Sequence, residues 1–157
     1  MKFNPIAFLI NLALTLSVGY LGMLFTQEAV NTWYTTLAKP TFNPPNWIFA
    51  PVWTLIFILM AIAASIIWQK RTSITHFPRT SAVYLIQLVL NVLWSFLFFY
   101  RHEIGMALIE ILILLAVVIV NARVFYKIDK TAGLLFLPYI LWLAFATVLN
   151  YNIFILN

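Results

Sequence analysis

The sequence predicts an all-α, polytopic membrane protein: a bundle of five transmembrane helices with a long first loop, rich in proline and tryptophan, that acts as a lid. Three observations predict this class. Hydrophobic residues make up 64% and charged residues 8% of the 157 residues, whereas about 25% of the residues in an average soluble domain are charged. Five apolar runs reach the roughly 20 residues that a helix needs to cross a hydrocarbon core of about 30 Å. The stretch between the first two runs is broken by prolines. We expect a single domain over residues 1–157.

Each of the five predicted helices is long enough to span the bilayer. Asn4 and Pro5 suit the cap and first turn of the first helix. A signal peptide is the alternative for this segment, but its apolar run is long and no A-x-A-like site follows, so we expect a retained helix. Small residues at positions 61–65 let another helix approach the second one closely, and Pro138 should kink the fifth helix or begin its regular part. The helices are expected at about residues 5–25, 47–68, 81–100, 104–122 and 132–155.

Residues 33–53, with the sequence WYTTLAKPTFNPPNWIFAPVW, hold four of the seven prolines and three of the six tryptophans. Because proline fixes φ and lacks an N–H donor, Pro44 and Pro45 prevent a continuous helix from Lys39 to about Asn46. Irregular backbone cannot face lipid at hydrocarbon depth, so this segment must lie at the interface or fold back over the helices. Its aromatic residues favour the second arrangement, a lid over about residues 26–46.

The basic residues are distributed unevenly between the two ends of the predicted bundle. Seven fall on one side, and only Lys39 and Arg101 fall on the other. By the positive-inside rule the N-terminus is cytoplasmic, while the lid and the C-terminus face outward. The pattern fits a bacterial cytoplasmic membrane, and topology explains the net charge of +5 better than nucleic-acid binding does. The seven residues are Lys2, Lys70, Arg71, Arg79, Arg123, Lys127 and Lys130.

Several kinds of chemistry are excluded by the residues present. The chain has no cysteine, which rules out disulfides, thiolate metal sites and thiol catalysis. His76 and His102 fall in polar connectors, so no histidine is placed to hold a haem in the membrane interior. No Ser/His/Asp set, metal-ligand spacing or pair of carboxylates on one face occurs. We therefore expect no metal, and any chemistry should be carried by the ligand.

The third helix carries a stripe of amide and aromatic side chains at Gln87, Asn91, Trp94 and Phe98. The spacing i, i+4, i+7 and i+11 places them on one face. Amides at hydrocarbon depth should face protein or a cavity. Interhelical hydrogen bonding in a packed core is an equally good interpretation of Gln87 alone. The whole stripe favours a cavity, because large aromatic residues and amides pack poorly between close helices.

Residues from the second and fifth helices should meet this stripe at one depth. At 1.5 Å per residue from the outer helix ends, the side chains concerned lie about 9–15 Å deep. They predict a flat, aromatic-lined pocket under the lid, with tight core packing as the alternative. The layer contains Trp53, Phe57, Asn91, Trp94, Trp142 and Ala146.

Charged residues near the outer face are few. Glu110 lies about 9 Å deep, where its carboxylate could reach water. Lys39 and Arg101 could pair with ligand carboxylates at the pocket mouth, although snorkelling to headgroups is the alternative for Arg101. Tryptophans at predicted helix ends are most simply interfacial belt residues. These tryptophans are Trp33, Trp47 and Trp68.

The chain resembles the translocator protein family, also called tryptophan-rich sensory proteins or peripheral-type benzodiazepine receptors. The resemblance rests on the stretch of residues 33–53, on QLVLNVLWSFLFF in the third helix and on PYILWLAFATVLNY in the fifth. It implies five transmembrane helices, a homodimer, and a pocket beneath the first loop for tetrapyrroles such as protoporphyrin IX and for synthetic isoquinoline or benzodiazepine ligands. The residues that match the family's pocket are Tyr34, Pro44, Pro45, Trp53, Phe57, Asn91, Trp94, Trp142 and Ala146.

From the resemblance we expect a tetrapyrrole-binding protein that promotes light-dependent oxidative breakdown of protoporphyrin, with Trp53 and Trp142 as the catalytic residues. No covalent cofactor is expected, and the partners are the tetrapyrrole, the lipid bilayer and a second copy of the chain. A carrier of tetrapyrroles or lipids and a sensor of tetrapyrrole and stress state remain alternatives. The expected ligand-binding residues are Tyr34, Lys39, Pro44, Pro45, Trp53, Phe57, Gln87, Asn91, Trp94, Phe98, Trp142 and Ala146.

Animal members of the family are linked to cholesterol through a motif of an apolar residue, a tyrosine and a basic residue. Leu149 and Tyr151 are present here, but no basic residue follows in positions 152–157. This segment therefore does not carry the complete motif.

Overall fold

The computed structural model describes residues 4–157, and Lys2 lies outside them. Helix α1 (Pro5–Asn31) begins as predicted: the Asn4 side chain accepts a hydrogen bond from the backbone N–H of Ala7 at 3.0 Å, and proline occupies the first turn. The helix does not end near residue 25 as predicted. Residues 26–31 lack proline and glycine, so the helix continues after the apolar run has ended.

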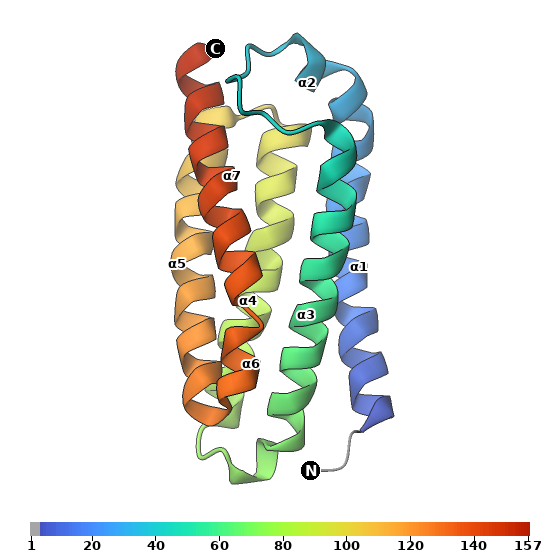
Figure 1. Cartoon of the computed structure of the whole chain (residues 1–157), viewed down its shortest axis with the longest axis vertical. Coiled ribbons are helices and arrows are strands. Elements are labelled where there is room, and N and C mark those ends of the chain that lie inside the picture. The colour runs from blue at the N-terminus through green and yellow to red at the C-terminus, as the bar shows by residue number, and fades with distance from the viewer. Residues whose placement is uncertain (1–3) are drawn as a thin grey trace.

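Five helical segments in the described part of the chain are long and apolar enough to cross a membrane, which confirms the predicted fold class. Figure 1 shows them running side by side along one axis. The segments are Pro5–Asn31, Asn46–Gln69, Phe77–Tyr100, Ile104–Ile128 and Lys130–Leu156. Their elements, after α1, are η1 (Asn46–Ile48) with α3 (Phe49–Gln69), α4 (Phe77–Ser95) with η3 (Phe96–Tyr100), α5 (Ile104–Ile128), and α6 (Lys130–Leu134) with α7 (Leu137–Leu156).

Two helices extend further than predicted at the basic end of the bundle. Helix α4 begins at Phe77 rather than near residue 81, and α5 continues to Ile128 rather than ending near residue 122. Long basic side chains such as Arg79 and Arg123 fall in these extra turns. Such side chains keep their charge in the headgroup region while their backbone stays helical, so hydropathy locates the membrane boundary and not the helix end.

The last span is divided where the sequence predicted irregularity. Asp129 caps α6 by accepting a hydrogen bond from the Ala132 N–H at 3.0 Å. Pro138 lies in the first turn of α7, so it begins the regular part of the fifth span. A second irregularity is the π-helical turn η3, in which the Arg101 N–H donates to the Phe96 carbonyl at 2.9 Å. The widened turn buries the consecutive residues Phe98 and Phe99 together.

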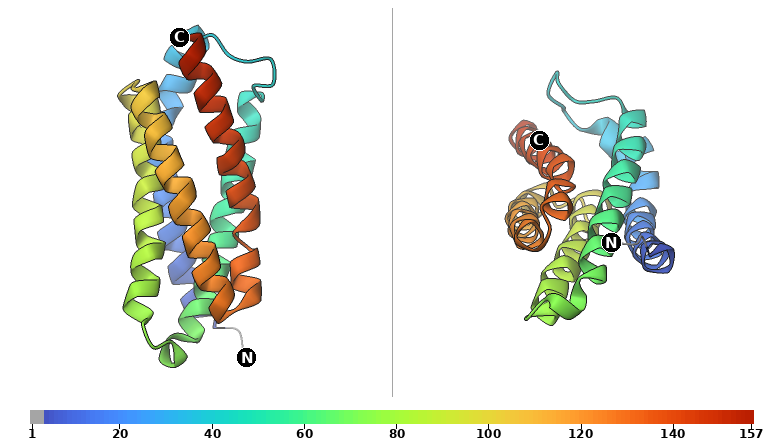
Figure 2. Two further views of the ribbon diagram at one scale, coloured as in Figure 1. Left: turned by 90° about the vertical axis from the view of Figure 1, so that its left-hand side faces the viewer. Right: turned by 60° about the horizontal axis from the view of Figure 1, so that its bottom comes forward.

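The loop after α1 forms one short helix, α2 (Trp33–Thr36), and is then irregular until η1. It crosses the end of the bundle that also carries the C-terminus (Figures 1 and 2). The Tyr34 hydroxyl donates to the Asn43 side chain at 2.7 Å. The Asn157 side chain accepts from the Ala38 N–H at 3.0 Å and donates to the Ala38 carbonyl at 2.9 Å. The loop is therefore fastened both to itself and to the end of α7.

The opposite end of the bundle carries the basic connectors, residues 70–79 and 123–130 (Figure 1). There the Lys70 ammonium lies 2.6 Å from the Asp129 carboxylate. The hydrogen bond from Lys70 holds the pKa of Asp129 below its ordinary value. Between this end and the middle of the bundle the helices are closely packed. The fully buried side chains in that half include Met60, Leu114, Val118, Phe125, Phe136 and Tyr139.

Candidate ligand-binding pocket

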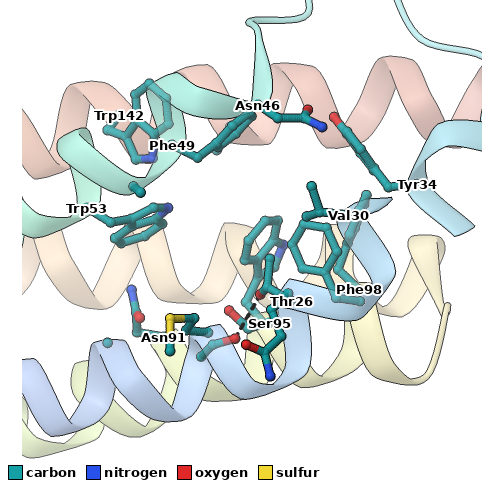
Figure 3. A pocket seen from close by; sticks show the side chains of 18 of the residues that line it. Thr26, Val30, Tyr34, Asn46, Phe49, Trp53, Asn91, Ser95, Phe98 and Trp142 are labelled. Atoms are coloured by element: carbon teal, nitrogen blue, oxygen red, sulfur yellow. Dashed lines mark hydrogen bonds between the residues drawn. The ribbon is translucent and has the colours of Figure 1, made fainter. Parts of the chain in front are cut away.

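A cavity of about 520 Å³ lies in the lid half of the bundle, between α1, α3, α4 and α7. Figure 3 shows Trp142, Phe49 and Trp53 around one part of it and Tyr34, Val30 and Phe98 around another. The volume falls within the roughly 300–1,000 Å³ typical of small-molecule sites. The cavity is separated from the basic end of the protein by the packed half of the bundle.

Aromatic rings form most of the deeper wall. Trp53 stacks on Phe57, with ring centroids 5.6 Å apart and 26° between planes. Trp94 stacks on Phe98 at 5.4 Å, and Phe49 meets Trp142 edge to face at 5.7 Å. Offset and edge-to-face pairs of this kind hold rings in defined orientations. The pocket therefore offers rigid, flat apolar surfaces.

Hydrogen bonds fix the polar side chains of the pocket. The Asn91 amide donates to the Tyr139 hydroxyl at 2.8 Å. The Trp94 indole N–H donates to the Asn150 side chain at 3.1 Å, and Asn150 in turn donates to the Ile104 carbonyl at 3.1 Å. Burial raises the pKa of Tyr34 to about 12, so its hydroxyl stays protonated and able to donate to Asn43. Helices α4 and α7 are thus linked behind the aromatic wall.

The pocket wall is uncharged. Within residues 4–157, no aspartate, glutamate, lysine, arginine or histidine lines it. Its polar groups are amides, hydroxyls and an indole N–H, which can donate or accept hydrogen bonds but cannot neutralise an ion. A ligand charge inside the cavity would therefore be unpaired.

Eight of the twelve expected ligand-binding residues line this one cavity, from five different elements. Most of these residues belong to the layer predicted from helix depth, and the structure also places them together. The eight are Tyr34, Trp53, Phe57, Asn91, Trp94, Phe98, Trp142 and Ala146.

The other four expected residues do not reach the cavity wall. Gln87 is fully buried one turn below Asn91, where its amide contacts the Met60 sulfur at 3.6 Å. At that level its amide meets the Met60 side chain of α3 and Gln87 does not line the cavity, so the core-packing alternative describes Gln87. Pro44 and Pro45 are part of the loop that leads into η1, and they shape the lid without lining the pocket.

Lys39 is engaged within the lid. Its ammonium donates to the carbonyls of Tyr34 at 2.6 Å and of Leu37 at 3.0 Å, and it lies 4.8 Å from the centre of the Tyr34 ring. Two of its three N–H groups are therefore occupied by backbone oxygens that a proline-containing loop leaves unpaired. In this structure Lys39 stabilises the lid and does not present a free charge to the cavity.

The expectation that Glu110 reaches water is wrong. Its side chain is 5% exposed, and neither carboxylate oxygen has a hydrogen-bond partner in the described part of the chain. Depth alone placed Glu110 near the outer surface, but α5 turns this face toward neighbouring helices. Arg101 and Trp47, by contrast, are exposed at the lid end.

Helix α1 contributes a wall of the pocket that was not predicted from the sequence. Pocket-lining residues recur along one face of this helix at i, i+4, i+7, i+11 and i+15. The spacing can be recognised in the sequence. Most of these residues are apolar, however, so the stripe resembles one that faces lipid. Gly19 belongs to the same side: a Cβ there would lie 2.6 Å from the Phe57 ring, so only glycine leaves room for this ring. The stripe consists of Leu16, Tyr20, Met23, Gln27 and Asn31.

Comparison with known proteins gives a consistent result. Residues 11–156 match the family model described as TspO/MBR family. The chain is 38% identical over 154 residues to the tryptophan-rich protein TspO of Archaeoglobus fulgidus, covering 98% of this chain and 99% of that protein. It is 36% identical over 125 residues to the tryptophan-rich sensory protein of Cereibacter sphaeroides, covering 80% and 77% of the two chains. It is 34% identical over 138 residues to the translocator protein of Bos taurus, covering 85% and 80%.

The match extends over almost the whole chain and includes all five spans and the lid. Together with the five apolar helices, it makes the protein an integral membrane protein. The chain belongs to the TspO/MBR family.

Proposed function

We propose that the protein binds protoporphyrin IX and similar hydrophobic tetrapyrroles in the pocket beneath the lid and promotes their light- and oxygen-dependent degradation. Family membership supports a sensor- or translocator-type role in the membrane. The observation that carries the proposal is the group of flat aromatic side chains around one uncharged cavity of about 520 Å³.

A planar, apolar macrocycle suits this wall better than a flexible or charged ligand. Stacking on indole and phenyl faces binds a rigid ring without a large loss of conformational entropy. Asn91 and the Tyr34 hydroxyl lie on the wall at different heights and can accept or donate hydrogen bonds. These groups would orient the ring without requiring a charge.

The chemistry would belong to the bound pigment. Light excites the porphyrin, the excited ring transfers its energy to O₂, and the resulting singlet oxygen adds across one carbon–carbon double bond of a methine bridge. Cleavage of that bond leaves one oxygen atom on each carbon as a carbonyl. Both atoms of O₂ end up in the product, so no external electron donor is needed. We assign Trp53 and Trp142 to the positions that touch the reacting ring.

Illumination of the purified protein with protoporphyrin IX tests the proposal, with the porphyrin absorption band and tryptophan fluorescence followed together. We expect loss of the band with formation of a new product in light and none in the dark. The double variant Trp53→Phe, Trp142→Phe should slow the loss, whereas Trp68→Phe, at the opposite end of the bundle, should not. Equal degradation by the double variant and the parent would refute the catalytic assignment.

Carriage of tetrapyrroles across the bilayer is the alternative function. It would need a path through the packed half, where Met60, Gln87 and Tyr139 are buried. Quenching of tryptophan without porphyrin loss, combined with uptake into sealed vesicles, would favour a carrier.

The proposal also includes a bacterial cytoplasmic membrane, with the N-terminus inside and the lid outside. The separation of the basic connectors from the lid end supports this orientation. A homodimer is proposed on the resemblance alone, and cross-linking in membranes would test it.

A further inference from the structure

The exposed residues of the pocket wall lie on only two of the described spans, the first and the second. Every pocket-lining residue of α4 and α7 is buried or half-buried, whereas eight lining residues elsewhere are exposed. These eight form two facing stripes, one on α1 and one on the outer part of the second span. The stripes are Leu16, Tyr20, Met23, Gln27 and Asn31 on α1, and Asn46, Ala50 and Thr54 on η1 and α3.

The gap between these stripes is closed toward the basic end of the bundle and open toward the lid end. Toward the basic end, Gly19 lies against the Phe57 ring, and the Ser65 hydroxyl comes within 3.5 Å of the Ala7 carbonyl. Above Gly19 the residues of the two helices that line the cavity are exposed, so its side is open between α1 and α3. We call this gap the side opening.

The remaining walls of the pocket are closed by side chains. Between α3 and α7 the gap is filled by ring pairs, Phe49 with Trp142 at 5.7 Å and Trp53 with Tyr139 at 6.0 Å. The top is covered by the lid, which Asn157 fastens through both backbone groups of Ala38. The side opening is therefore present while the lid is fastened.

The side opening faces lipid over most of its height. Helix α1 has 27 residues, about 40 Å at 1.5 Å per residue, which exceeds a hydrocarbon core of roughly 30 Å. Met23 lies about 12 Å and Tyr20 about 16 Å from the lid end of α1, within the apolar part of the helix. The amides of Gln27, Asn31 and Asn46 lie nearer the lid, where headgroups and water begin. The opening is thus apolar at acyl-chain depth and polar at headgroup depth.

We propose that the pocket is loaded sideways from the membrane, through the side opening and not through the lid, and that it accepts planar amphiphiles in uncharged form. A ligand dissolved among acyl chains reaches the opening without crossing water. The uncharged wall then receives it without an unpaired ion. This proposal rests on the proposed function only in using a porphyrin as one of its probes.

The kinetic experiment uses protein in lipid nanodiscs and the uncharged dimethyl ester of protoporphyrin IX. Ala50→Phe and Thr54→Phe place bulk in the side opening, and Leu55→Phe places the same ring on an exposed position of α3 that does not line the pocket. We expect Ala50→Phe and Thr54→Phe to slow association and dissociation together by about tenfold or more, which needs a barrier increase of only about 1.4 kcal/mol. Leu55→Phe should leave both rates unchanged. The diacid should bind more weakly than the ester.

A locked lid tests whether ligand entry requires the lid to open. The chain has no cysteine, so Ala38→Cys with Asn157→Cys can be joined by a short bis-thiol reagent without side reactions. Ester binding should proceed at the parental rate with the lid locked. A locked lid that blocks binding, or bulky substitutions at positions 50 and 54 that change neither rate, would overturn the proposal.

A probe that needs no porphyrin separates this proposal from the proposed function. Ala146→Cys places a thiol on the buried pocket wall. We expect a lipid-soluble, uncharged pyrene maleimide to label it faster than a charged methanethiosulfonate, and Ala50→Phe to slow the labelling. If the labelling follows this pattern but the protein does not bind porphyrin, the proposed function is refuted and entry through the side opening stands. If Ala50→Phe leaves the labelling rate unchanged, entry through the side opening is refuted, whether or not the protein binds porphyrin.

Discussion

The indole of Trp33 stacks on the imidazole of His102, with ring centroids 4.1 Å apart and 14° between planes. Trp33 begins the short lid helix α2, and His102 lies in the turn between the third and fourth spans with φ at 57°. The pair therefore fastens one end of the lid to a backbone turn in the left-handed region, where non-glycine residues are uncommon. The Ala38–Asn157 pair fastens its middle to α7.

Removal of the His102 ring should loosen the lid. We expect His102→Ala to weaken lid docking by about 0.5–1.5 kcal/mol, the usual range for an aromatic pair. Faster amide hydrogen exchange in residues 33–45 would show it, with no change in α5. His76→Ala, at the opposite end, serves as the control. Because glycine tolerates positive φ, His102→Gly should show the same lid exchange at a higher overall stability than His102→Ala.

Gly19→Ala should disturb the pocket from the side of α1. The added Cβ would lie 2.6 Å from Cε2 and 2.8 Å from Cδ2 of Phe57, so the ring must move. Overpacking of this kind costs about 1–3 kcal/mol, and it should also displace Trp53 from its stack on Phe57. Thermal unfolding in detergent would report the loss. Gly22→Ala, whose Cβ would meet only the Ser95 side chain, 3.3 Å from its hydroxyl oxygen and 3.8 Å from its Cβ, should cost less.

Gln87 and Asn91 should respond differently to the same substitution. Gln87 is fully buried with its carbonyl oxygen unpartnered in the described chain, so Gln87→Leu should be neutral or slightly stabilising. Asn91→Leu removes the bond to Tyr139 and a polar group of the pocket wall, so it should destabilise by about 1–3 kcal/mol and weaken ligand binding. A titration with the porphyrin ester and a thermal melt of each variant would distinguish them. Equal loss of binding in both variants would contradict the placement of Gln87 outside the pocket.

The Lys70–Asp129 ion pair should make stability depend on pH at acidic values. Because Lys70 lowers the pKa of Asp129 in the folded protein, the pair stabilises above the ordinary carboxyl pKa and loses this effect as pH falls through the lowered value. Both side chains are partly exposed, so the contribution at neutral pH should be only about 0.2–1 kcal/mol. We expect Lys70→Met to lower the melting temperature at pH 7 and to match the parent at strongly acidic pH. Lys127→Met is the control, and its melting temperature relative to the parent should not change with pH in this way. If the Lys70→Met variant still melts at a lower temperature than the parent at strongly acidic pH, the ion pair is not the cause of the difference.

The spans, the capped start of α1, the irregular lid and the aromatic layer could be predicted from the sequence. Each of these depends on a local property: the length of an apolar run, the fixed φ of proline, or the distance of a residue from a helix end. Trp53, Trp94 and Trp142 could be grouped by depth alone, because 1.5 Å per residue applies to every helix.

The tertiary structure alone decided which helix face meets which neighbour. In a soluble helix the polar face marks the outside, but a membrane helix is apolar toward both lipid and core, so its sequence carries little rotational information. For that reason the sequence does not reveal the α1 wall, and it predicts water contact for Glu110 and a place in the pocket for Gln87, whereas both side chains are buried away from the cavity. The side opening between α1 and α3 depends on which faces these two helices turn toward the cavity, which is a property of their packing and not of either sequence by itself.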